Sequence, residues 1–279
     1  MEEVAVGQFE ELTKGQIEGL SSVSEDFDGN LFFATSEGFI YALNHSGFEK
    51  CAETGGQPFC ILHDTSNTLF IADLAQQAIY SYSDEDSVQE LIKSYEGRPY
   101  LGPNSMAFHE SSNSLYFTDS GPLGETSLAS PRGSVYVADV ESGNIKPVIL
   151  DSLAHPAGIA MNSDGKCIYV AETYRNRIIK ICTSSNGSYH SSVFYQFSGR
   201  LGPTAMCISD SNLLYVAQYE FSSLSPKGKI SVINSSGVLV KFFSTPISEI
   251  TSMSFSRMKN NILYITGAGK CYKVAIPGP

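Results

Sequence analysis

A short strand-like phrase recurs six times along the chain, and this repeat limits the possible folds more than any other feature. Each copy begins with Leu or Ile, continues with aromatic or aliphatic residues, and usually ends in a polar residue. The copies start at residues 31, 69, 115, 168, 214 and 263, so successive copies lie 38 to 53 residues apart. Repeats of this length, built from short strands, are typical of β-propellers, in which one repeat forms one four-stranded blade. The sequence therefore predicts an all-β, six-bladed β-propeller.

A second apolar strand precedes each phrase and is expected to form the inner edge of its blade. These segments are rich in small residues, which suit the axis where the blades converge. Two of them are nearly identical, with LGPNSM at residues 101–106 and LGPTAM at residues 201–206. The expected inner strands are residues 18–23, 58–62, 103–108, 156–161, 203–208 and 251–255. Third strands are expected at residues 38–43, 78–82, 134–140, 177–181, 229–233 and 271–275.

The last repeat lacks a fourth strand, because its third strand ends close to the C-terminus. The chain begins with an unassigned apolar stretch at residues 4–9. We expect this stretch to supply the outer strand of the last blade, which would close the ring and remove a sheet edge. Residues 1–279 are then expected to form a single propeller domain.

Charge and composition exclude some classes of partner. The formal net charge is −11, from 18 Lys and Arg against 29 Asp and Glu, whereas nucleic-acid binding depends on clustered cations. No window of 18 consecutive apolar residues predicts a membrane span, and the N-terminus lacks the pattern of a signal peptide. We therefore expect a cytoplasmic protein with no nucleic-acid partner. The six cysteines form no CxxC motif, and free buried thiols are the favoured interpretation.

Two rings of residues are expected at one mouth of the central channel, since each inner strand starts where the antiparallel second strand ends. The first ring is Glu18, Phe59, Asn104, Ala157, Thr204 and Thr251. The second ring is Thr35, Asp73, Asp119, Glu172, Gln218 and Gly267. Carboxylates and neutral oxygen atoms around one opening suit a hard divalent cation, and they are equally consistent with a solvated polar rim.

Several of these phrases resemble a known superfamily. GPNSMAF at residues 102–108 with LYFTDS at 115–120, and HPAGIAM at 155–161 with IYVAET at 168–173, resemble the six-bladed gluconolactonases, paraoxonases and strictosidine synthase-like proteins. The AET ending and the insert at residues 120–132 are most similar to the strictosidine synthase-like branch. Related propellers with NHL repeats share some of these motifs.

The resemblance implies particular site residues. Gluconolactonases and paraoxonases hold calcium or a similar divalent ion at the channel mouth, and Glu18 and Asn104 match two of its four ligands. Ala157 and Thr204 stand where the other two would be, so Asp119 and Glu172 are the candidate replacement ligands. In strictosidine synthases the catalytic Glu lies on the sixth inner strand, where this chain has Thr251, with Glu249 two residues earlier.

Two functional hypotheses follow. The first is a lactone or ester hydrolase with a divalent ion, with Glu18, Glu249 and His155 as catalytic candidates. Asp73, Thr204, Gln218 and Thr251 would line its mouth, and the inserts at residues 120–132 and 219–228 would wall it. The second is a non-catalytic propeller that binds a protein or a small ligand at the same mouth, because a fold does not fix a function.

Overall fold

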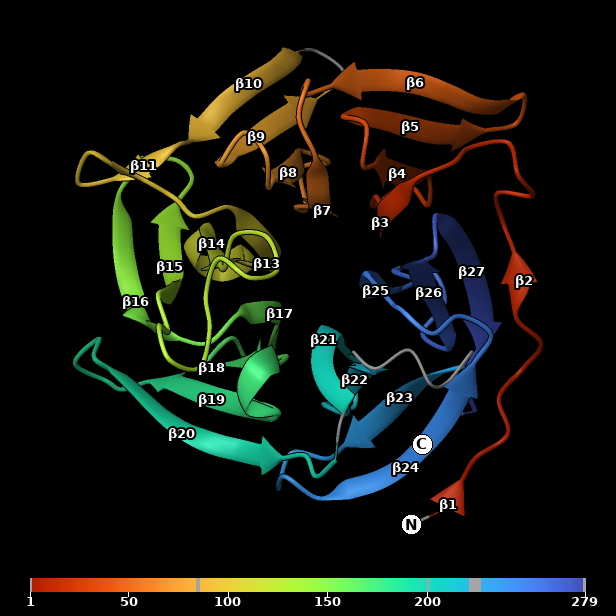
Figure 1. The fold of residues 1–279 in the computed structure, drawn as a ribbon. Helices are drawn as coiled ribbons and strands as arrows, with labels where there is room; N and C mark the ends of the chain where they lie inside the picture. Colours follow the sequence, from red (N-terminus) through yellow and green to blue (C-terminus); the bar gives the residue numbers. More distant parts are fainter. Residues whose placement is uncertain (1, 84–85, 200, 221–226, 278–279) are drawn as a thin grey trace.

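The computed structural model describes residues 2–83, 86–199, 201–220 and 227–277. Six antiparallel sheets surround one central axis (Figure 1), which confirms the predicted six-bladed β-propeller. In each blade the strand that precedes the recurring phrase lies innermost, and the phrase itself forms the second strand. Every cluster of buried apolar side chains joins two neighbouring blades, as where Phe70 and Ile79 meet Leu115 and Phe117. The core therefore lies between the blades rather than on the axis.

The blades follow one another in chain order. The first three blades are β3 (Leu20–Glu25), β4 (Leu31–Thr35), β5 (Phe39–Asn44) and β6 (Gly47–Glu53); β7 (Pro58–His63), β8 (Leu69–Asp73), β9 (Ala78–Ser83) and β10 (Asp86–Ile92); and β13 (Pro103–His109), β14 (Ser114–Asp119), β15 (Gly133–Asp139) and β16 (Ile145–Leu153). The next two are β17 (Pro156–Met161), β18 (Cys167–Glu172), β19 (Arg177–Thr183) and β20 (Tyr189–Gln196); and β21 (Leu201–Ile208), β22 (Leu214–Glu220), β23 (Gly228–Ile233) and β24 (Leu239–Thr245). The last blade is β25 (Ser252–Phe255), β26 (Ile262–Gly267), β27 (Lys270–Ala275) and β2 (Glu10–Glu11).

Five short elements complete the described chain. β1 (Glu2–Glu3) adds to the edge of β24 in parallel, and β11 (Ser94–Tyr95) pairs with β12 (Arg98–Pro99) between blades two and three. The 3₁₀ turns η1 (Glu110–Ser112) and η2 (Thr173–Arg175) lie beside the inner strands. In the part of the chain that the structure describes, no helix is long and apolar enough to cross a membrane.

The N-terminal segment closes the last blade as predicted, but through different residues. The strand that pairs with β27 is Glu10–Glu11, whereas residues 4–9 form no strand. They run along the outside of the last two blades (Figure 1), with single backbone hydrogen bonds from Val4 to Phe242 (2.9 Å) and from Gly7 to Ala275 (2.8 Å). Val4, Val6 and Phe9 pack on the apolar cluster between these blades. Their spacing breaks the two-residue period of a strand after Val6, which explains the corrected range.

The expectation of six free thiols is wrong for one pair. Cys167 and Cys182 lie opposite each other on β18 and β19, and their sulfur atoms form a disulfide. The other four cysteines form no disulfide among the described residues, and Cys271 is fully buried. A cross-strand pair depends on the register of two strands, which cysteine spacing alone does not reveal.

Candidate functional site

A cavity of about 550 Å³ lies on the propeller axis, lined mainly by the six inner strands. At one end it reaches the first-ring residues Phe59, Asn104, Ala157, Thr204 and Thr251, which we call the near mouth. At the other end it reaches His63, Phe108, Met161, Ile208 and Phe255, which we call the far mouth. Four residues separate the two sets along each strand, or about 13 Å at the rise of a β-strand. The cavity is therefore a channel rather than a shallow depression.

The strand register corrects the first ring in blade one. Pro58, Pro103, Pro156 and Pro203 each pair with the second-ring residue on the second strand of the same blade. In blade one the residue in that position is Leu20, which pairs with Thr35, so Ser21 rather than Glu18 corresponds to Asn104. Glu18 is exposed, precedes β3 and does not line the cavity. No proline marks the start of this inner strand, which is why the sequence placed the ring residue three positions too early, at Glu18 instead of Ser21.

Hydroxyl groups of the first ring bond the inner strands to one another. Ser21 Oγ donates to the carbonyl of Pro58 (2.7 Å), and Thr251 Oγ1 donates to the carbonyl of Ser21 (2.7 Å). Thr204 Oγ1 likewise donates to the carbonyl of Ile250 (3.3 Å). These bonds link adjacent blades around the axis. The main role of these hydroxyl groups is therefore to hold the inner strands together, and not to bind a ligand.

The acidic residues of the second ring bind the turns that lead into the inner strands. Asp73 accepts hydrogen bonds from the backbone N–H groups of Gln57 (2.8 Å) and Gln76 (2.9 Å). Asp119 accepts from the N–H groups of Leu101 (3.1 Å) and Gly102 (2.8 Å). Burial raises the pKa of Asp119 to about 6, although these two donors act in the opposite direction. Neither carboxylate lines the cavity.

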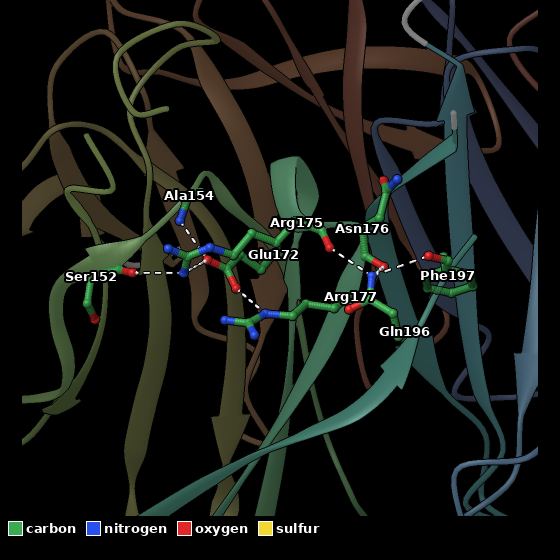
Figure 2. A network of polar contacts seen from close by, with 8 residues as sticks. All are labelled: Ser152, Ala154, Glu172, Arg175, Asn176, Arg177, Gln196 and Phe197. Carbon is green, nitrogen blue, oxygen red and sulfur yellow. Dashed lines mark hydrogen bonds and ion pairs between the residues drawn. The ribbon is translucent and has the colours of Figure 1, made fainter. Parts of the chain in front are cut away.

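Glu172 occupies the same position in blade four and makes the strongest set of contacts. Its fully buried carboxylate accepts from the N–H of Ala154 (2.8 Å) and forms ion pairs with Arg175 (2.6 Å) and Arg177 (2.5 Å). Figure 2 shows both guanidinium groups directed at this one carboxylate. The equivalent Gln218 accepts instead from Ser231 Oγ (2.6 Å). Asp119 and Glu172, the candidate replacement ligands, thus bind backbone N–H groups and, for Glu172, two arginines. Neither side chain lines the channel.

His155 is the sequence-predicted catalytic residue that the structure places on the channel wall. Its side chain is 5% exposed, and its Nδ1 atom has no hydrogen-bond partner among the described residues. The ring lies 5.3 Å from the ring of Tyr174, measured between centroids. Burial lowers the pKa of His155 to about 4, so the imidazole is neutral at pH 7. A neutral imidazole on the channel wall can accept a proton from a bound molecule through a ring nitrogen that faces the channel.

Asn104 and Glu249 also line the near mouth. Asn104 is buried and donates from Nδ2 to Ser120 Oγ (3.1 Å), whose hydroxyl in turn donates to the carbonyl of Gly121 (3.0 Å). This chain of donors fixes the amide orientation and leaves its second N–H for a ligand. Glu249 is exposed at the rim. The near mouth thus combines a fixed amide, a neutral imidazole and one exposed carboxylate.

The residues at the near mouth do not fit a tightly held calcium ion. Calcium takes six to eight oxygen ligands, several of them from carboxylates. The first ring as the register defines it contains Ser21, Phe59, Asn104, Ala157, Thr204 and Thr251, with no carboxylate. Among the residues that the structure describes, no group of three or more His, Cys, Asp or Glu side chains is arranged to hold a metal ion. Asn104 is the one ring residue with an uncommitted ligand atom of the kind calcium prefers.

The insert at residues 120–132 reaches the near mouth. The sequence predicted this insert as one of two segments that wall the mouth, the other being residues 219–228. Leu123 lines the cavity and is 58% exposed. The insert is held by a hydrogen bond from the Gly124 N–H to the Tyr174 hydroxyl (3.2 Å) and by the Arg132–Glu125 ion pair. Tyr219 of the second expected wall also lines the cavity, while residues 221–226 lie outside the described residues.

The sheets, the axial channel and its polar near mouth define a six-bladed propeller with a ligand-sized cavity. Comparison with known families then places the chain: the family described as the SMP-30/Gluconolactonase/LRE-like region matches residues 24–269. The chain belongs to this family, which confirms the resemblance seen in its sequence.

Individual relatives agree with this assignment. The lactonase drp35 of Staphylococcus epidermidis is 28% identical over 235 residues, which cover 80% of this chain and 67% of that protein. A calcium-binding protein, regucalcin, from Agrobacterium tumefaciens superposes with a TM-score of 0.80 at 16% identity, over 99% of this chain and 96% of that one. A gluconolactonase from Xanthomonas campestris gives 0.76 at 18% identity, over 94% and 87% of the two chains. At these identities the solved structures establish the shared fold.

Replacing Glu172 with Gln is expected to lower the free energy of unfolding by about 3 to 5 kcal/mol, because it leaves two guanidinium groups beside a neutral amide. Urea denaturation of the variant measures this change. Glu53→Gln is the matched control, since it breaks the exposed Lys50–Glu53 pair and should change stability by less than about 1 kcal/mol. Equal effects of the two substitutions would contradict a structural role for Glu172.

The lowered pKa of His155 predicts an acid-sensitive contribution to stability. Since the unfolded chain takes up a proton near its usual pKa and the folded chain resists it, this contribution is present above about pH 6.5 and is lost toward pH 4. Between pH 7.5 and 5 the loss is about 2 kcal/mol. The difference in unfolding free energy between the native protein and His155→Gln should change by that amount over this range. A difference that does not change with pH over this range would refute it.

Proposed function

We propose that this chain is a lactonase-like hydrolase that opens a small uncharged lactone or ester at the near mouth, without a tightly held divalent ion. The observation that carries the proposal is His155, a buried and neutral imidazole that lines the channel at the near mouth. Membership of the gluconolactonase family and the sequence similarity to the drp35 lactonases support this reaction class.

His155 would act as the general base. It takes a proton from a water molecule as the water oxygen attacks the carbonyl carbon, and it returns the proton to the ring oxygen when the carbon–oxygen bond breaks. The product is a hydroxy acid, or an alcohol and an acid from an ester. A base with a pKa near 4 is weak, so this arrangement favours substrates with an activated carbonyl and a rate that varies little above pH 5.5.

Asn104 would bind the carbonyl oxygen. Its amide orientation is fixed by Ser120, so its remaining N–H is available to an oxygen atom that gains negative charge during the reaction. Phe59 and Leu123 supply apolar surface at the same mouth. The small number of polar groups favours a compact apolar lactone or aryl ester over a heavily hydroxylated one.

Independence from calcium distinguishes this proposal from the one that the family resemblance implies. The regucalcin structure is described as that of a calcium-binding protein, whereas the near mouth of this chain offers no ring carboxylate. In our proposal the polarisation that a divalent ion would supply is left to the Asn104 amide. Glu18, Asp119 and Glu172 take no part in the chemistry.

A second candidate function is binding of a small molecule at the near mouth without turnover. The absence of ring carboxylates favours it, because a family member that loses metal ligands can keep its cavity while losing its reaction. The two candidates share one site and differ only in whether a bound ester is cleaved.

Hydrolysis of phenyl acetate and of δ-valerolactone by the purified protein, with and without excess EDTA, tests the proposal. We expect turnover that EDTA leaves unchanged and that His155→Gln lowers at least about 100-fold in kcat/KM. Asn104→Ala should lower kcat with little change in KM, because its hydrogen bond strengthens in the transition state. His45→Gln should retain full activity. Loss of activity with EDTA would favour a metal enzyme, and binding without turnover would favour the second candidate.

A further inference from the structure

The insert between β14 and β15 is anchored beside both reactive groups of the near mouth. At its start, the Ser120 hydroxyl accepts from Asn104 Nδ2 (3.1 Å). Further along, the Gly124 N–H donates to the Tyr174 hydroxyl (3.2 Å), and the Tyr174 ring lies 5.3 Å from that of His155, measured between centroids. The segment between these two anchors therefore runs from the side of Asn104 to the side of His155.

Leu123 is the apolar residue between the two anchors. A hydrogen bond from the Glu125 N–H to the Pro122 carbonyl (3.0 Å) closes a tight turn, in which Gly124 has a φ of +97°. Glycine adopts this φ readily, so it allows the turn that presents Leu123. The Leu123 side chain lines the cavity and is 58% exposed. An ordered turn thus holds an apolar side chain at the rim of the near mouth, with more than half of its surface uncovered.

Leu128 on the same insert provides a comparison. It is 61% exposed and does not line the cavity. It belongs to a second turn, which is closed by a hydrogen bond from the Ser127 N–H to the Ser130 carbonyl (3.1 Å). Single exposed apolar side chains are common on protein surfaces, so exposure alone assigns a role to neither leucine. Leu123 differs from Leu128 in its place on the cavity wall, beside the two reactive groups.

The near mouth suits an uncharged ligand that carries an apolar substituent. The cavity measures about 550 Å³, within the range of sites that hold drug-sized ligands, so it accommodates more than a lactone ring. Glu249 is exposed at the rim and would repel an anionic substituent. With the carbonyl group of a ligand at Asn104 and His155, a hydrocarbon chain on its ring can extend onto Leu123.

We propose that Leu123 is the specificity-determining residue of the near mouth and selects lactones that carry an alkyl chain on the ring. The inference rests on the proposed function for the reacting group, and it adds the residue that recognises the substituent. Contact between the alkyl chain and Leu123 removes apolar surface of both from water, which favours the substituted ligand over the bare ring. Tyr174 is a positioning residue, because its hydroxyl holds the turn that presents Leu123.

Binding of two cyclic ketones tests the role of Leu123 without any reaction. Cyclohexanone and 3-pentylcyclohexanone have the shapes of δ-valerolactone and δ-decalactone, but neither can be hydrolysed. In calorimetric titrations the native protein should bind the pentyl compound at least about tenfold more tightly. Leu123→Ala should lower the affinity for the pentyl compound about fivefold and leave that for cyclohexanone unchanged. Leu123→Met should keep most of the preference, because it conserves the apolar volume.

Leu128→Ala is the matched control, because it removes a similarly exposed leucine from the same insert. It should change neither affinity. Tyr174→Phe removes the hydroxyl and keeps the ring beside His155, so it should lower the preference about two- to threefold with cyclohexanone binding unchanged. Equal native affinities for the two ketones, an unchanged preference in Leu123→Ala or in Tyr174→Phe, or the same loss in Leu128→Ala would each overturn the proposal.

Hydrolysis of δ-valerolactone and δ-decalactone separates this inference from the proposed function. The native protein should have the higher kcat/KM for δ-decalactone. Leu123→Ala should remove this preference mainly by raising KM, because Leu123 contacts a part of the substrate that does not react. Turnover without a preference between the lactones would overturn the role of Leu123 alone. Absence of turnover would overturn the proposed function, while the ketone affinities still decide the role of Leu123.

Discussion

In blades two to four, the start of the inner strand is held by one hydrogen-bonded acceptor at the end of the second strand of the blade. This acceptor is a carboxylate, from Asp73, Asp119 or Glu172, and it receives the N–H groups of the turn that enters the blade. A turn that crosses between blades has no ladder to satisfy its backbone groups, and a buried unpaired N–H is costly. The three carboxylates therefore fix where these three inner strands begin, and with them half of the channel wall.

Bonds around the axis then complete the wall. The hydroxyls of Ser21, Thr204 and Thr251 bridge neighbouring inner strands, and the N-terminal segment joins the last blade to its predecessor. Some polar side chains line the channel without taking part in these bonds between strands. At the near mouth these are His155 and Asn104, and at the far mouth they are His63, Glu110, Asp210 and Arg257.

The sequence predicted the architecture because a propeller repeats its pattern of apolar strands, and Pro58, Pro103, Pro156 and Pro203 mark where inner strands begin. Blade one has Leu20 in that place, so the same reasoning shifted its ring residue to Glu18. The alternation of side chains along a strand does not tell whether a carboxylate at its end points to the axis or to a turn. The structure shows that Asp119 and Glu172 both bind turns.

A crystal structure of the protein grown with excess calcium would test most directly the claim that the near mouth works without a metal ion. The account predicts that Asn104 contacts only water or an organic ligand there, with Ala157 and Thr204 beside it and the Glu172 carboxylate still bound to its two arginines. An anomalous peak at about 2.3 to 2.6 Å from the Asn104 oxygen, completed by Glu18 or by a reoriented Asp119, would contradict it.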